Sequence, residues 1–183
     1  MNVINETLFV IWFFLPAGIA NMAPVFAAKA GVLKSLDKPV DLGKSYKGIR
    51  IFGDHKTIRG FVTGIIAAIV FVWLQKLILA NSPVVLRLDY ANISPLLLGT
   101  LMGLGALVGD AIKSFFKRRV GVKPGKSWVP WDQVDFVIGA SVLTYFYIPL
   151  PLYQYVLVVV VFFLLHMASK YIGYLTGLNK DPI

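Results

Sequence analysis

Long apolar stretches separated by short polar segments dominate the chain. Five stretches stand out, at residues 3–26, 60–80, 94–116, 134–150 and 152–175. Because the hydrocarbon core of a bilayer is roughly 30 Å thick, about 20 mostly apolar helical residues cross it. The pattern therefore predicts an all-α integral membrane protein with about five transmembrane helices. The fourth stretch is short, and Pro149 and Pro151 flank a tight turn before the fifth.

The organisation predicted is a single membrane domain over residues 1–183, without an internal repeat. The first apolar stretch has no basic segment before it and no clear small-residue cleavage site after it. We therefore interpret it as a retained helix rather than a signal peptide. The glycine pairs Gly99–Gly103 and Gly105–Gly109 predict close helix packing. Packing within the chain is favoured, and a homodimer interface is the alternative.

Basic residues gather in two polar segments, at residues 27–59 and 117–133. By the positive-inside rule both segments are cytoplasmic. That places the N-terminus outside and the C-terminus, with Lys170 and Lys180, inside. The same rule and anionic lipid head groups account for the net charge of +9, so no nucleic-acid partner is expected.

Composition narrows the chemistry that a site could use. Only 15% of the residues are charged, against about 25% in soluble domains. The chain has no cysteine, and its two histidines show no ligand spacing, which leaves little room for a zinc or thiolate site. Carboxylates are the remaining ligands, and with nine acidic residues in the chain each one is informative.

Asp110 lies within the third apolar stretch, near its cytoplasmic end. A carboxylate inside a membrane is costly and marks a functional site by default. Lys113, Ser114 and Lys117 follow it at spacings that share one helix face. In the structural alternative, Asp110 only pairs with Lys113 or Lys117 at helix spacing.

Asp132 and Asp135 form a second acidic motif, where the fourth helix begins. In the structural alternative Asp132 is the helix N-cap and Asp135 lies in the first turn. Together with Asp110, however, they place three carboxylates at one membrane surface among lysine and arginine residues. Hard cations take oxygen ligands and share them with phosphates, so this arrangement favours a site for Mg²⁺ and a polyphosphate.

Two further segments suit nucleotide binding. Residues 53–60 combine glycines with Lys56, Thr57 and Arg59 where the second helix begins, and free amides at a helix N-terminus attract phosphate. The spacing is not that of a P-loop. Near the end of the first helix, Pro24 frees upstream carbonyls and Asn21 offers a donor and an acceptor for a nucleobase edge. A simple helix end fits these two residues equally well.

Together these motifs resemble the membrane cytidylyltransferases that make CDP-activated lipids. Residues 109–118 and 130–135 are similar to the C-terminal signature of bacterial CDP-diacylglycerol synthases, although Gln133 replaces an arginine and a His-Gly-Gly stretch is absent. The chain is more similar to the archaeal CDP-archaeol synthase family. That family also has about five spans and an Asn-x-x-Pro near the end of the first helix. It shares Pro-x-Asp-x-Gly, here at 39–43, and Gly-Asp-x-Lys-Thr-x-Arg-Gly, here at 53–60.

The resemblance implies transfer of CMP from CTP to the phosphate of an isoprenoid ether lipid, giving CDP-archaeol and pyrophosphate. It implies Mg²⁺ bound by Asp110, Asp132 and Asp135, which act in catalysis together with Lys117. The lipid tails are expected between helices that open to the bilayer. The residues implied to bind substrates are Asn21, Pro24, Asp54, Lys56, Thr57, Arg59, Ser114, Arg118 and Gln133.

Other functions are also compatible with these motifs. A CDP-diacylglycerol synthase acting on phosphatidic acid uses the same chemistry. An ion or small-solute transporter would use Asp110 in an ion path, but such proteins favour inverted repeats or broken mid-membrane helices, which the sequence lacks. A non-enzymatic scaffold gives no reason for three clustered carboxylates.

Overall fold

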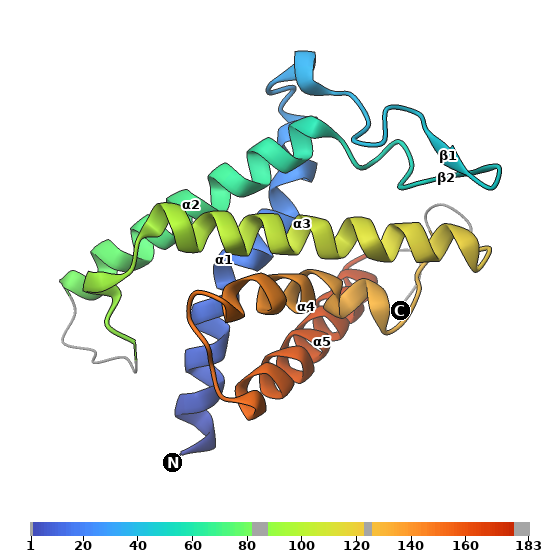
Figure 1. Cartoon of the computed structure of the whole chain (residues 1–183). Coiled ribbons are helices and arrows are strands. Elements are labelled where there is room, and N and C mark those ends of the chain that lie inside the picture. Colours follow the sequence, from blue (N-terminus) through green and yellow to red (C-terminus); the bar gives the residue numbers. More distant parts are fainter. Residues whose placement is uncertain (1, 82–87, 123–125, 178–183) are drawn as a thin grey trace.

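The fold is all-α, as predicted. The computed structural model describes residues 2–81, 88–122 and 126–177 (Figure 1). In that part the chain forms helices α1 (Val3–Lys29), α2 (Ile58–Ala80), α3 (Pro95–Arg119), α4 (Trp131–Tyr145) and α5 (Leu152–Leu175). Two short 3-10 helices, Lys34–Leu36 and Tyr90–Asn92, and a hairpin of β1 (Ser45–Tyr46) and β2 (Ile49–Arg50) complete it.

Four of these helices are long and apolar enough to cross a membrane: α1, α2, α3 and α5. Helix α4 has 15 residues, which corresponds to a length of about 22 Å, short of the hydrocarbon core. It begins at Trp131 and ends at Tyr145, earlier at both ends than the predicted span 134–150. The count of five spans therefore stays a prediction.

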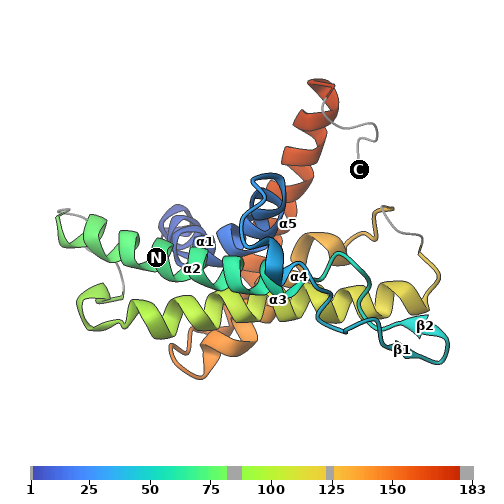
Figure 2. The ribbon, with the colours of Figure 1, turned by 90° about the horizontal axis from the view of Figure 1, so that it is seen from above.

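The helices form one bundle. Figure 2 shows α2 and α3 side by side, with α4 on the other flank of α3. Helix α1 packs against α2, α3, α4 and α5, and α5 also packs on α4. The segment between α1 and α2, the end of α3 and the start of α4 lie at the same end of the bundle (Figure 1). The two basic segments of the sequence therefore meet.

Glycines on α3 bring its neighbours to backbone contact. A Cβ atom at Gly99 or Gly103 would collide with the backbone of α2, and one at Gly105 or Gly109 would collide with the backbone of α4. At Gly109 the colliding group is the carbonyl of Asp135. Both glycine pairs thus serve packing within the chain, as predicted, and the homodimer stays a prediction.

Helix α1 is joined to α2 by a hydrogen bond to a carbonyl that a proline leaves free. Pro16 has no N–H, so the carbonyl of Trp12, four residues earlier, loses its helical partner. The side-chain Nε2 of Gln75, which is buried on α2, donates to this carbonyl at 2.6 Å. The bond satisfies a backbone acceptor that has no partner within its own helix.

A second proline of α1 sets the position of the α2 N-terminus. Pro24 also lies inside the helix and leaves the carbonyl of Ala20 without its usual partner. Gly64 of α2 approaches this carbonyl so closely that a Cβ there would lie 2.8 Å from it. One turn earlier, a Cβ on Gly60 would lie 3.2 Å from the Pro24 ring. The first turn of α2 is therefore held against the inner end of α1.

Candidate active site

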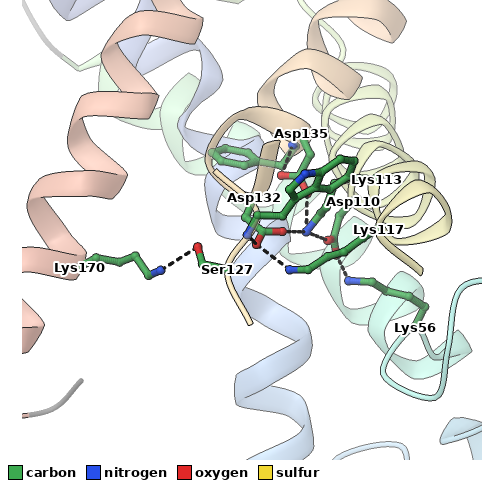
Figure 3. A network of polar contacts seen from close by, with 10 residues as sticks. Lys56, Asp110, Lys113, Lys117, Ser127, Asp132, Asp135 and Lys170 are labelled. Carbon is green, nitrogen blue, oxygen red and sulfur yellow. Dashed lines mark hydrogen bonds and ion pairs between the residues drawn. The ribbon is translucent and has the colours of Figure 1, made fainter. Parts of the chain in front are cut away.

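A group of alternating charges lies between α3, α4 and the segment before α2 (Figure 3). The spacing of the α3 residues places their side chains on one helix face. The close approach of Gly109 to Asp135 brings the α4 carboxylates against that face. We call this group the charged cluster: Lys56, Asp110, Lys113, Lys117, Asp132 and Asp135.

Lys113 is at the centre of the charged cluster. Its Nζ atom lies 3.1 Å from Asp110 Oδ1, 2.7 Å from Asp132 Oδ1 and 3.0 Å from Asp135 Oδ2. Its side chain is 14% exposed. Sequence reasoning missed this role, since it considered Lys113 only as a helical partner of Asp110. The signal was present: Lys113 shares one face with both Asp110 and Lys117.

Asp132 links the two helices instead of capping one. Its Oδ2 accepts from Lys117 Nζ at 2.6 Å and from the backbone N–H of Trp128 at 2.6 Å. Pro130 occupies the N-cap position, without a side-chain cap. The alternative of Asp132 as N-cap is therefore wrong. Two ammonium groups are stronger partners for a carboxylate than the neutral amides of its own helix.

Asp135 is buried, at 6% exposure. Its Oδ1 accepts from the backbone N–H of Phe136 at 2.7 Å. Its Oδ2 has no hydrogen bond within the described residues and only the ion pair to Lys113. A buried carboxylate oxygen with so few partners is costly. A cation bound next to the Asp135 Oδ2 atom would therefore be stabilised by its negative charge.

Lys56 reaches the charged cluster from the segment before α2, where it forms an ion pair with Asp110. Two backbone hydrogen bonds hold this part of the segment: Val40 N–H to the Lys56 carbonyl at 2.7 Å, and Ile58 N–H to the Lys38 carbonyl at 2.9 Å. The next residue, Thr57, caps α2 by accepting from the N–H of Gly60 at 3.1 Å. Lys56 is thus presented at the start of a helix that is itself fixed against α1.

The fold of the 41–53 loop depends on Asp41, whose side chain is fully buried. It accepts from Arg50 Nη2 at 2.7 Å and from the backbone N–H groups of Gly43, Phe52 and Gly53 at 3.0 to 3.2 Å. Burial alone raises the pKa of the Asp41 carboxyl, but these hydrogen bonds outweigh burial and hold the pKa well below its usual range. From the sequence, Asp41 stands out only as part of the motif at residues 39–43.

Two predicted substrate-binding residues have partners away from the charged cluster. Arg59, 8% exposed, pairs with Asp37 at 2.9 Å. Asp54 is exposed and pairs with Arg50 at 2.6 Å. The structure therefore does not bring Arg59 and Asp54 together with the three carboxylates. Both stabilise the segment that carries Lys56.

The remaining predicted residues lie on α3 and α1. Ser114 is buried on α3, and Arg118 is partly buried in the last turn of that helix. Asn21 is partly buried on α1, close in sequence to Pro24, which packs on the first turn of α2. On the far side, Lys170 of α5 donates to Ser127 at 3.2 Å (Figure 3).

Gln133, next in sequence to Asp132, is completely buried. Its Oε1 and Nε2 atoms have no hydrogen-bond partner in the described ranges of the chain. A buried amide with two unpaired polar atoms costs free energy. This makes Gln133 a candidate for contact with a polar ligand, and its role in substrate binding stays a prediction.

The donor set of the charged cluster suits a hard divalent cation. Three carboxylates converge on a single positive group, the Lys113 ammonium, which stands in for such a cation. As the side chains stand, no group of three His, Cys, Asp or Glu residues among the described residues could hold a metal ion. The ammonium group itself separates the carboxylates.

An apolar cavity of about 510 Å³ adjoins the charged cluster. It lies between α3 and α4 and is walled by side chains such as Ile112, Phe116, Ile138 and Val142. Lys113 and Asp135 also line it, together with Trp128 and Trp131. The same cavity is therefore lined by apolar side chains along its wall and by the charged residues Lys113 and Asp135 of the charged cluster.

Comparisons with known proteins agree with this architecture. A family model described as CarS-like, CDP-archaeol synthase, matches residues 1–182. The CDP-archaeol synthase of Methanosarcina barkeri is 40% identical over 183 residues, covering 92% of this chain and 99% of that protein. The CDP-archaeol synthase of Methanocaldococcus jannaschii is 34% identical over 174 residues, covering 92% and 93%.

A solved structure has the same fold. It is described as an intramembrane enzyme for archaeal membrane lipid biosynthesis, and it is 31% identical with a TM-score of 0.70. The match covers 87% of this chain and 91% of that one. The chain therefore belongs to the CDP-archaeol synthase family.

Proposed function

We propose that the charged cluster is the active site at which this chain makes CDP-archaeol. The chain is a multi-pass membrane nucleotidyltransferase that transfers CMP from CTP to an archaeal ether-lipid phosphate and releases pyrophosphate. The residue roles, the metal and the orientation in the membrane that follow are our proposal.

One observation carries the assignment of the site: the apolar cavity between α3 and α4 ends at the charged cluster. A lipid phosphate with isoprenoid tails needs both environments side by side. Its hydrocarbon chains fit the apolar wall of the cavity, and its head group fits beside the lysines and carboxylates of the charged cluster. Neither environment alone would distinguish this substrate from a soluble phosphate or from a bulk lipid tail.

The reaction needs little general-base help, because the attacking lipid phosphate is already ionised. One of its oxygens forms a bond to the α-phosphorus of CTP, and the bond from that phosphorus to the oxygen bridging to the β-phosphate breaks. Catalysis therefore consists mainly of positioning and charge neutralisation. Lys117 on α3 and Lys56 on the facing segment bind the phosphates and neutralise the two anions as they approach. Gln133 and Asn21 offer amide groups to the nucleotide.

Asp110, Asp132 and Asp135 would hold Mg²⁺. When bound, the ion supplies positive charge that polarises the α-phosphoryl group and stabilises the leaving pyrophosphate. The fit is supported by the convergence of the three carboxylates on one ammonium group and by the buried Asp135 oxygen that lacks a hydrogen bond among the described residues.

The site faces the cytoplasm, with the N-terminus outside and the C-terminus inside. The two basic segments, which the positive-inside rule assigns to the cytoplasm, meet at the end of the bundle that carries the charged cluster (Figure 1). CTP is a cytoplasmic metabolite, so this orientation gives it direct access. A cysteine placed in the 81–93 loop is expected to react with a reagent that cannot cross the membrane only from outside.

Pyrophosphate release by the purified full chain in detergent with Mg²⁺ tests the proposal. We expect release with CTP but not ATP, and with the ether lipid phosphate in preference to diacyl phosphatidic acid. Asp110→Asn, Asp132→Asn and Asp135→Asn should each lower turnover by at least about 100-fold. Asp89→Asn, which affects an exposed carboxylate in the segment before α3, is the matched control. Near-normal turnover in all three variants would contradict the assignment of the charged cluster as the active site. A preference for phosphatidic acid would make the chain a CDP-diacylglycerol synthase.

The cavity is tested separately by filling it. Val142→Trp should raise the KM for the lipid while leaving the KM for CTP nearly unchanged, because Val142 lines the apolar wall on α4. Leu164→Trp, at an exposed position on α5, provides the control. Equal effects of both variants would remove the tail-binding role of the cavity.

A further inference from the structure

Lys113 differs from the other lysines of the charged cluster in the number of carboxylates that it contacts. Lys56 pairs with Asp110 and Lys117 with Asp132. Lys113 alone, among the described residues, contacts Asp110, Asp132 and Asp135 together, at 2.7 to 3.1 Å. It is also the lysine of the charged cluster that lines the apolar cavity.

Three carboxylates this close would repel one another strongly away from bulk water. The Lys113 ammonium compensates that repulsion and thereby holds α3 and α4 carboxylates in register. Yet the ammonium occupies the position that a metal ion bound by all three carboxylates would take. Mg²⁺ lies at about 2.0 to 2.1 Å from its oxygen ligands, whereas the ammonium keeps the same oxygens farther apart. The ammonium and a metal ion therefore exclude each other.

We propose that Lys113 is a built-in counter-ion, which keeps the three carboxylates assembled before substrates bind and leaves their centre when a divalent cation enters. The inference rests on the proposed function of the charged cluster. The four-carbon stem of lysine is flexible enough for this movement. Lys113 also lines the edge of the adjoining cavity, so its ammonium borders the place where the head group of the lipid is proposed to bind. Lys113 is thus a positioning residue for the metal site in the free protein and a phosphate partner in the complex.

The proposal predicts that Lys113 competes with metal ions. In the full chain in detergent and without nucleotide, Mn²⁺ binding is measured by the electron paramagnetic resonance signal of the free ion. Lys113→Met should bind Mn²⁺ about tenfold tighter than the wild type or better, since a competing unit charge is removed from the centre. A residue with a merely structural role would, on removal, weaken metal binding rather than strengthen it.

Lys117→Met is the matched control, because Lys117 lies on the same face of α3 and contacts a single carboxylate of the charged cluster. Its effect on Mn²⁺ affinity should be clearly smaller. The melting temperature provides a second readout. Lys113→Met should melt lower than the wild type without metal and recover when Mn²⁺ is added, whereas wild-type Tm should change little. If the methionine variant does not fold without metal, purification in Mn²⁺ should restore it, while Lys113→Arg should fold without metal.

The outcomes separate this inference from the proposed function. Equal Mn²⁺ affinity in the wild type and Lys113→Met, with loss of binding in Asp135→Asn, would overturn the counter-ion role and leave the metal site standing. Absence of Mn²⁺ binding in all three proteins would overturn the metal site itself, and the inference with it. Weaker binding in Lys113→Met would also overturn the inference, because the ammonium would then support the metal ion.

Discussion

Lys56 and Asp110 form an ion pair although 54 positions separate them in the chain. The pair joins the segment before α2 to the first charged residue on that face of α3. It is this contact that makes the segment a wall of the charged cluster rather than a loop beside it. Both side chains are mostly buried, at 20% and 17% exposure, so the pair is shielded from salt more than a surface pair is.

Replacing Lys56 should therefore impair substrate binding and turnover together. Lys56→Ala removes a positive charge at the predicted phosphate site, and we expect kcat/KM for CTP to fall about 100-fold. The matched control is Lys44→Ala, which removes an exposed lysine from the same segment. Steady-state pyrophosphate release checks this, and equal effects of the two variants would mean that only general positive charge matters.

Asp41 should make the fold of the segment before α2 depend on pH in a defined direction. Its pKa is lowered in the folded chain, so the charged form stabilises the fold above its ordinary pKa of about 3.9. That contribution is present at neutral pH and is lost as the pH falls below 3.9 toward the lower folded pKa. Limited proteolysis between residues 30 and 57 should therefore stay slow from pH 7 to about 4 and accelerate below.

The variant Asp41→Asn checks the cause. It removes the charge at every pH, so cleavage of the segment should be fast throughout and no longer change near pH 4. Loss of the carboxylate that accepts hydrogen bonds from four donors should also cost about 1–3 kcal/mol of local stability. Slow cleavage in this variant at neutral pH would show that the hairpin β1–β2 holds the segment without Asp41.

Gly109 should be sensitive to the addition of one methyl group. A Cβ there would collide with the carbonyl of Asp135, so Gly109→Ala must push α4 away from α3. Overpacking of this kind costs about 1–3 kcal/mol, and it moves two carboxylates away from Lys113. We expect turnover to drop by more than the loss of folded protein accounts for. Gly18→Ala, whose Cβ would have an ordinary 3.8 Å contact with Phe162, is the control and should be nearly neutral.

The bond between Gln75 and Trp12 is predicted to depend on Pro16. Gln75→Leu should lower stability by about 1 kcal/mol, a typical value for hydrogen bonds between helices in membranes. In the Pro16→Ala background the Trp12 carbonyl regains its helical partner, so the same substitution should cost much less. Thermal unfolding in detergent of the wild type, the two single variants and the double variant measures the coupling free energy between Gln75 and Pro16. Additive effects of the two substitutions would contradict the assignment.

Much of the architecture could be predicted from periodicity and charge. Runs of about 20 apolar residues have few alternatives to transmembrane helices, because each backbone group must be satisfied within the helix. Thus α1, α2, α3 and α5 appear where the apolar stretches predicted them. Helix α4 was harder to predict, since it ends at Tyr145, before Pro149, and its first turn contains the polar residues Asp132 and Gln133.

The sequence by itself determined which residues could carry chemistry: there are few carboxylates, and Asp110 has lysines at helical spacing after it, while Asp132 and Asp135 lie three positions apart. Only the tertiary structure decided which of them meet. Arg59 and Asp54 pair elsewhere, whereas Lys113, which looked like a helical partner of Asp110, contacts carboxylates from two helices. The reason is geometric. Local spacing specifies neighbours along one helix, but contacts between helices depend on how closely two backbones approach, and here glycines on α3 decide that distance.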